Sequence, residues 1–184
     1  MNEIAYEGMS TPWGKAQDIE IINDSMAWVS TESHGGIKVS PYLNTMIPKI
    51  LREKGGWYEE DCQWSIPFFF CQKIDLKNMN EHVEAHKTLK NQYWYEYEII
   101  FRRWLAKGES LGKDKYLWET ENAEKFKMWS ALRLENGLVR TWWRVNTEES
   151  KEIILTKETL EKLRNNETYR TTALTLEELE SIAV

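Results

Sequence analysis

Asn136-Gly137 is the short stretch that says most about the fold of this chain. It separates two strand-like runs of apolar residues. Asn-Gly is the pair that two-residue type I′ turns prefer, because both turn positions need a positive φ. A turn of this kind also fixes which residues of the two strands face each other. The sequence therefore predicts an antiparallel β-hairpin in the second half of the chain.

The predicted register gives the hairpin one face for the core and one face that points outward. In this register Arg133 lies directly opposite Arg140. Side chains alternate between the two faces of a strand. The outward face then carries Trp129, Arg133, Arg140, Trp142 and Arg144. Facing arginines repel each other unless each stacks on a neighbouring tryptophan or a negative group bridges them.

Two interpretations of this outward face stay open. In the first, acidic side chains of the same protein cover it. In the second, it is a contact surface for phosphate groups or for an acidic protein. Mixtures of arginine and tryptophan are common at the centres of protein interfaces, and both side chains stack on the bases of single-stranded nucleic acid.

A second stretch of interest is Ser30 to Gly36, which reads Ser-Thr-Glu-Ser-His-Gly-Gly. We expect a turn here, because paired glycines tolerate a positive φ and let another backbone or a ligand come close. His34 is the histidine that does not lie on an evidently helical segment. Its pKa near neutrality suits an acid, a base or a ligand.

An acidic stretch about twenty residues further on is the natural companion of His34. It contains Glu59, Glu60, Asp61 and Cys62. A carboxylate from this stretch can orient the imidazole, or the thiol can act as the nucleophile beside it. In the alternative, His34 bonds a backbone carbonyl and shapes the turn, while the carboxylates favour the first turn of a helix. No third group lies at a recognisable triad spacing.

These residues define two candidate sites in the first half of the chain. For an enzyme, the catalytic candidates are His34, Glu60, Asp61 and Cys62. For a binding protein, the triplet Glu59 to Asp61 is a second surface, suited to a basic groove on a partner protein.

Four short motifs in the first half carry a resemblance. They are Thr11-Pro12-Trp13-Gly14, Ser30 to Gly36, Ser40-Pro41 and the run from Gly56 to Trp64. Together they resemble an uncharacterised family of domains of unknown function that is widespread on phages, plasmids and other mobile elements. The resemblance covers roughly the first half of the chain. It implies an accessory protein of a mobile element and no particular activity.

His82 and His86 lie four residues apart, as helical metal-binding pairs do. The glutamate between them is not where zinc peptidases place their base, and no further ligand is evident nearby. We therefore expect no metal site and no cofactor.

Composition narrows the partners and the compartment. A net charge of −6 argues against general coating of DNA, which needs a basic face, but leaves room for a local basic patch. The ten tryptophans suit cores, protein interfaces and base stacking alike. No apolar run approaches the ~20 residues that span a bilayer, and the amino terminus lacks a secretory pattern. We expect a cytoplasmic protein with no membrane partner.

The remaining patterns complete an α+β prediction: a small N-terminal antiparallel sheet, central helices, and a C-terminal antiparallel hairpin sheet with flanking helices. Expected strands outside the hairpin lie at 19–22, 26–31, 37–39, 151–155 and 171–174, and expected helices begin at Pro41, Trp57, Glu81, Lys157 and Leu176. The helix from Glu81 should run to about Leu105, after a polar connector at 73–80. A glycine-containing stretch at 107–115 separates residues 1–106 from residues 107–184 within one compact body.

The leading functional hypothesis is a non-enzymatic binding protein of a mobile genetic element. It fits an inhibitor of a host defence nuclease, of the anti-CRISPR or anti-restriction type, with a host protein or ribonucleoprotein as partner and a possible local contact to nucleic acid. The chain has no phosphate loop, dinucleotide fingerprint or serine nucleophile elbow.

Two alternatives remain beside this hypothesis. One is a nuclease or small hydrolase that uses His34 with Glu60, Asp61 or Cys62. The other is a single-stranded RNA-binding module that stacks bases on Trp129 and Trp142. The sequence does not determine the oligomeric state.

Overall fold

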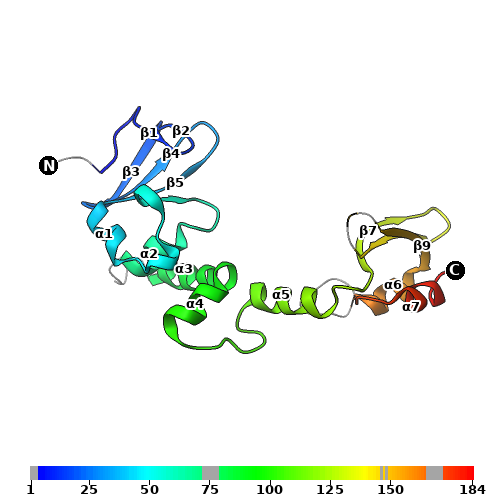
Figure 1. The fold of residues 1–184 in the computed structure, drawn as a ribbon. Coiled ribbons are helices and arrows are strands. Elements are labelled where there is room, and N and C mark those ends of the chain that lie inside the picture. The colour runs from blue at the N-terminus through cyan, green and yellow to red at the C-terminus, as the bar shows by residue number, and fades with distance from the viewer. Residues whose placement is uncertain (1–3, 72–78, 146, 148, 165–171) are drawn as a thin grey trace. The chain divides into compact units, whose positions relative to one another are not determined.

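A computed structural model describes residues 4–71, 79–145, 147, 149–164 and 172–184 of the chain (Figure 1). The chain divides into two compact units, Met1–Gly112 and Lys113–Val184, called here the N-terminal and C-terminal units. Each combines an antiparallel sheet with helices, which confirms the α+β prediction. The division falls inside the connector expected at 107–115. That the units form one compact body stays a prediction.

The N-terminal unit is built on a four-stranded antiparallel sheet. Its strands, in spatial order, are β3 (Asp18–Asn23), β4 (Met26–Ser30), β5 (Gly35–Val39) and β6 (Trp57–Glu59). A short hairpin of β1 (Ser10–Thr11) and β2 (Gly14–Lys15) precedes it. The three strands predicted within residues 19–39 are confirmed.

The prediction of a helix from Trp57 is wrong. Trp57–Glu59 pairs with β5 instead. Gly55 and Gly56 both have positive φ, so they end the preceding 3-10 turn and redirect the chain into the sheet. Tyr58 is fully buried in that position, and aromatic residues suit a half-buried pleated surface. The helix begins only at Ser65.

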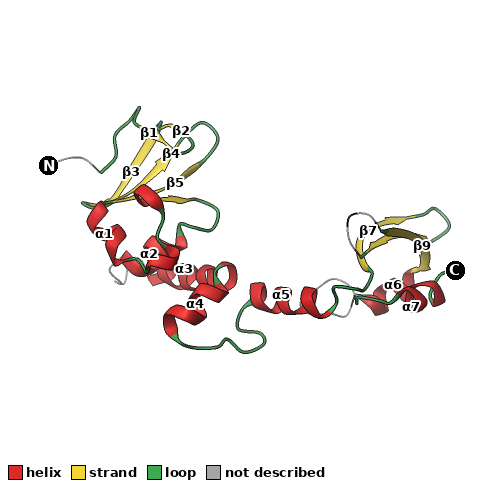
Figure 2. Cartoon of the chain, viewed as in Figure 1, coloured by secondary structure: helices red, strands yellow, loops and turns green. Residues whose placement is uncertain are grey.

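Helices cover one face of this sheet (Figure 2). They are α1 (Pro41–Met46), α2 (Ser65–Cys71), α3 (Met79–Gln92) and α4 (Trp94–Phe101), with 3-10 turns η1 (Lys49–Leu51) and η2 (Lys54–Gly56) after α1. The expected start of α1 is confirmed: the Ser40 side chain accepts from Leu43 N, and Pro41 follows at the first helical position.

The single long helix expected from Glu81 is in fact two helices. The break is at Tyr93, whose φ of −121° and ψ of 38° are not helical. The second helix, α4, ends at Arg102 in the left-handed conformation, with φ of 49°. The connector expected at 73–80 lies mostly outside the described residues.

The C-terminal unit is a three-stranded antiparallel sheet with helices on one face. The helix α5 (Leu111–Glu121) crosses from the first unit into the second. The strands are β7 (Lys127–Arg133), β8 (Leu138–Arg144) and β9 (Ser150–Thr156), in that order, and the covering helices are α6 (Lys157–Leu163) and α7 (Leu176–Ser181). Leu160 of α6 and Leu179 of α7 pack with Val139, Trp143 and Leu155 of the sheet.

The helix starts predicted for this unit from capping residues are confirmed. Thr156 caps α6, and Thr175 forms a capping box with Glu178 at the start of α7. The strand expected at 171–174 is reduced to one bridge between Phe126 and Leu174, and residue 171 lies outside the described residues. None of the described helices has the length and apolar character that crossing a membrane requires.

Candidate functional site

The hairpin between β7 and β8 is present, but its loop has three residues where we predicted two. Leu134 N donates to Leu138 O at 2.9 Å, and Gly137 N donates to Leu134 O at 3.1 Å. Gly137 has a φ of 80°. This is a tight turn followed by a left-handed glycine, the usual form of a three-residue hairpin loop. The additional loop residue shifts the register of the strands.

The shift separates the two arginines that were expected to face each other. Arg133 pairs with Val139, and Arg140 pairs with Leu132. Since Val139 belongs to the core beneath the helices, Arg133 lies on that face and Leu132 takes its place on the outward face. The predicted register is therefore wrong, and Arg133 does not belong with the other outward residues.

A bulge in β7 returns Trp129 to the outward face. The pairing skips one residue between Met128 and Ser130, as in a β-bulge. Trp129 is 56% exposed, and the guanidinium carbon of Arg144 lies 5.5 Å from the centre of its ring. The outward face thus keeps four of its five predicted members. We call Trp129, Arg140, Trp142 and Arg144 the Arg/Trp face.

One acidic side chain of the same sheet occupies part of this face. Glu152 of β9 lies opposite Trp142 and accepts a hydrogen bond from Trp142 Nε1 at 3.1 Å. Its other oxygen lies 3.2 Å from Arg140 Nε, in an ion pair that lacks hydrogen-bond geometry. An acidic side chain of the protein therefore covers Arg140, as the first interpretation predicted. Arg144 instead stacks on Trp129.

The His34 turn is closed by backbone and hydroxyl groups. Thr31 N and Thr31 Oγ1 both donate to His34 O at 2.7 Å, and His34 N donates to Thr31 Oγ1 at 3.2 Å. The imidazole takes no part in these bonds. It points toward the acidic stretch, and His34 Nδ1 lies 4.0 Å from Glu60 Oε1.

The structure thus brings His34 together with one of the predicted carboxylates, at the surface. The two side chains are 60% and 36% exposed, so water screens the pair and weakens it. Glu59 turns back on its own loop and accepts from Asp61 N at 2.9 Å and Cys62 N at 3.5 Å. Asp61 is exposed.

Cys62 is poorly suited to act as a nucleophile. Burial raises the pKa of its thiol, and the charges of Glu59 and Asp61 raise it further. The thiolate is the reactive form of cysteine, and these surroundings favour the protonated form. The arrangement therefore lacks the positive charge that activates a catalytic thiol.

Gly35 and Gly36, beside His34, let the motif residues pack closely on one another. Both have ordinary strand conformations, so the expected positive φ is wrong, whereas the expected close approach is confirmed. A Cβ on Gly36 would lie 2.3 Å from Trp13 Cη2 and 2.3 Å from Tyr58 O. Trp13 in turn meets Trp57 edge to face, with ring centres 5.8 Å apart. Three of the four motifs that carried the resemblance therefore pack on one another, through Trp13, Gly36 and the Trp57-Tyr58 pair.

His82 and His86 belong to an aromatic cluster. Both stack on Phe69, with ring centres 5.0 and 5.1 Å away, and His86 Nε2 lies 3.0 Å from Tyr97 OH. Burial is the main factor that lowers the pKa of His86. The described residues contain no group of three or more side chains suited to hold a metal ion.

Two cavities have linings that include no residue of the Arg/Trp face or of the His34 turn. The smaller, about 110 Å³, is in the C-terminal unit and is lined in part by Arg133, Lys157 and Arg164. The larger runs beside β3 in the N-terminal unit. Neither cavity was predicted from the sequence. The one signal for the larger cavity is the alternation of isoleucines with an acidic residue in Ile19-Glu20-Ile21, the pattern of a strand with one apolar face.

Comparisons with known proteins identify a family but no activity. A family model described as a domain of unknown function, DUF7007, matches residues 6–123, more than half of the chain. The matched segment spans nearly all of the N-terminal unit together with α5, and it ends before β7. No curated protein and no solved structure matches the chain. The chain therefore belongs to the DUF7007 family, whose members share a domain of unknown function.

Proposed function

We propose that this protein is a non-enzymatic binding protein and that the Arg/Trp face holds its partner. One observation carries the proposal. The C-terminal sheet packs both of its described helices against one face, while the other face presents Trp129 and Arg144 to solvent. Polar residues are usual on the solvated face of an antiparallel sheet, so an exposed tryptophan beside an arginine is unusual there.

The composition of the face suits recognition of a macromolecule. Burying an exposed aromatic side chain contributes roughly 1.5–3 kcal/mol, and tryptophan and arginine are the residues most enriched in binding hot spots. Arg144 lies over the ring of Trp129, and a contact that restrains side chains before binding lowers the entropy lost on binding. Trp142 is also held by its hydrogen bond to Glu152.

The partner that best fits this face carries acidic groups. Guanidinium groups bind carboxylates and phosphates in planar, two-pronged contacts. In the mobile-element setting that the motifs suggest, such a partner is a cytoplasmic host protein or ribonucleoprotein, for example a defence nuclease of the CRISPR or restriction type. The net charge of −6 favours one localised contact over general binding along nucleic acid.

The test reverses the charge of Arg140 and Arg144 together. The matched control is Lys157→Glu with Lys162→Glu on α6, since these residues also pair with glutamates but belong to a helix on the covered side of the sheet. Each intact chain serves as bait in a host lysate, and mass spectrometry quantifies the captured proteins. We expect a captured nuclease to be lost with Arg140→Glu/Arg144→Glu and kept with the control.

Two results would argue against the proposal. Capture that is unchanged in Arg140→Glu/Arg144→Glu would remove the Arg/Trp face from consideration. Quenching of tryptophan fluorescence by single-stranded RNA, with steep dependence on salt, would instead favour an RNA-binding module. Circular dichroism of each variant shows that the fold is intact.

A nuclease or small hydrolase centred on His34 is the second candidate. The observation that favours it is the approach of His34 Nδ1 to Glu60 Oε1 at 4.0 Å. The raised pKa of Cys62 leaves Glu60 as the partner of the imidazole in such a mechanism. Its test is the His34→Ala variant described in the Discussion.

A further inference from the structure

The outer edge of β3 is one of the two edges of the four-stranded N-terminal sheet. β3 is the first strand in the spatial order β3-β4-β5-β6, so no described strand lies along its other side. An edge strand presents unpaired backbone N–H and C=O groups that can pair with another extended chain. At six residues, Asp18–Asn23 is long enough to take a short peptide as a further strand.

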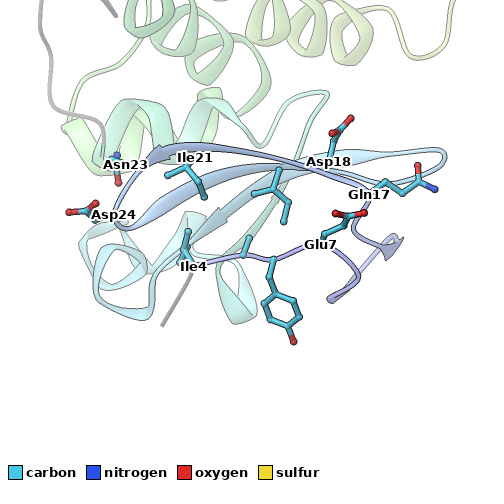
Figure 3. Close-up of a pocket in the computed structure, with 10 residues that line it drawn as sticks. Ile4, Glu7, Gln17, Asp18, Ile21, Asn23 and Asp24 are labelled. Atoms are coloured by element: carbon cyan, nitrogen blue, oxygen red, sulfur yellow. The ribbon is translucent and has the colours of Figure 1, made fainter. Parts of the chain in front are cut away.

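A groove of about 760 Å³ lies beside this edge (Figure 3). Residues 4–7 form one side of it, and residues 17–24, which include β3, form the other. Ile4, Ile19 and Ile21 provide an apolar surface along the groove. Ile21 is 56% exposed, although an isoleucine gains about 1.5–3 kcal/mol from full burial.

The charges along the groove have a single sign. Glu7, Asp18 and Asp24 line it, and its lining as described includes no lysine or arginine. Figure 3 shows Asp18 and Asp24 at opposite ends of the strand, with Glu7 on the facing segment. Asp18 begins the strand and Asp24 follows its last residue, so a stretch of extended chain of roughly 17 Å, at the usual rise per residue, lies between them. The lining therefore combines an apolar surface with negative charge at both ends.

We propose that this groove binds an extended, cationic segment of a partner protein, which adds to β3 as a further strand. Main-chain hydrogen bonds along the edge would supply affinity without regard to sequence. Because side chains alternate along an added strand, one set would contact Ile19 and Ile21 while lysines or arginines reach the carboxylates. This inference concerns a different surface from the Arg/Trp face and does not depend on it.

The chemistry of the groove decides between possible occupants. The three carboxylates of the groove repel nucleic acid and acidic proteins. The class of partner proposed for the Arg/Trp face is therefore excluded from the groove. Acidic residues at a sheet edge also discourage aggregation. That role alone does not explain a groove in which the side chain of Ile21 stays exposed.

The experiment uses the intact chain and a fluorescein-labelled peptide, acetyl-Lys-Val-Lys-Val-Lys-Val-Lys-amide. Fluorescence anisotropy measures its affinity, and a second peptide with glutamate at each lysine position tests the charge. We expect saturable one-to-one binding of the lysine peptide and none of the glutamate peptide. Hydrogen exchange of the complex should show protection of the amides of residues 18–23.

Charge-reversal variants show where on the protein the peptide binds. Asp18→Lys with Asp24→Lys should weaken binding at least tenfold. The matched control is Glu32→Lys with Glu84→Lys, which makes the same change in net charge at two exposed positions outside the groove, and it should bind within twofold of the wild type. Equal weakening in both variants, or protection of amides elsewhere than β3, would overturn the proposal. So would equal binding of the two peptides.

Discussion

Gly36→Ala is the sharpest test of the claim that the motif residues form a structural cluster. The added methyl group would lie 2.3 Å from Trp13 Cη2 and 2.3 Å from Tyr58 O. Carbon atoms in contact prefer separations of about 3.5–4.0 Å, so each neighbour would have to move by about 1 Å or more. Tyr58 O belongs to the backbone of β6, which pairs with β5 at this point. It cannot move without loosening that pair.

The expected cost follows from the rigidity of these neighbours. Overpacking a well-packed core costs about 1–3 kcal/mol, and occasionally more. We place Gly36→Ala at the upper end, about 3 kcal/mol, because a backbone atom and a tryptophan ring both stand in the way. With an m-value of about 2 kcal/mol per molar in urea, the unfolding midpoint of the N-terminal unit falls by about 1.5 M.

Gly35→Ala is the matched control, since it makes the same change one residue away in the same strand. Its closest contact would be Glu60 Oε2 at 2.7 Å, the end of a flexible and partly exposed side chain that can swing aside. The nearest backbone atom, Val29 O, would lie at 3.1 Å and needs to give by only a few tenths of an ångström. The cost should stay below about 1 kcal/mol, as for overpacking that relaxes easily. Tryptophans occur in both units. Hydrogen exchange of peptides from β5 and β6 is therefore the better probe. Equal losses in the two variants would refute the argument.

Two further predictions concern buried and exposed side chains of the same unit. Tyr58→Phe should cost about 1–3 kcal/mol, because it leaves Glu53 N and Asn44 Oδ1 without their partner. Burial raises the pKa of Tyr58 to about 12 from 10, so the wild type should lose stability as pH rises from 10 to 12. This loss should be smaller in Tyr58→Phe, as urea titrations at pH 9 and 11 would show. His34→Ala should change the free energy of unfolding by less than about 0.5 kcal/mol, as expected for an exposed pair. If the wild type turns over a nucleic-acid or ester substrate and His34→Ala does not, the enzyme is favoured over the binding protein.

Local chemistry made parts of the fold predictable. The start of α1 depends on the Ser40 hydroxyl and the fixed φ of Pro41, and the start of α7 on the reciprocal bonds of Thr175 and Glu178. Each involves atoms within a few residues of one another, so the sequence contains all the relevant information. The alternation along β8 was equally informative, because burial of Val139 and Trp143 requires that Arg140 and Arg144 point the other way.

Other features depend on partners that are distant along the chain. Asn136-Gly137 does mark a turn, but both two- and three-residue loops accept a glycine after asparagine, and the choice moved Arg133 to the other face. Trp57 and Tyr58 fit a helical stripe as well as a strand. Only pairing with β5 decides between them. The groove beside β3 exists because residues 4–7 lie against that strand, which no local pattern indicates.

The two proposed surfaces differ in their relation to the family. The family match covers residues 6–123, which include the packed motif cluster and the lining of the groove beside β3 except Ile4 and Ala5, but it ends before the sheet that carries the Arg/Trp face. Motif residues such as Trp13 and Gly36 touch each other, so they identify the fold without indicating a reaction. A function common to the family would have to use a surface within the matched residues, which are nearly all of the N-terminal unit together with α5, and most of the groove lining lies there. The Arg/Trp face, in contrast, would give this chain a second binding surface, one that prefers an acidic partner where the groove prefers a cationic one.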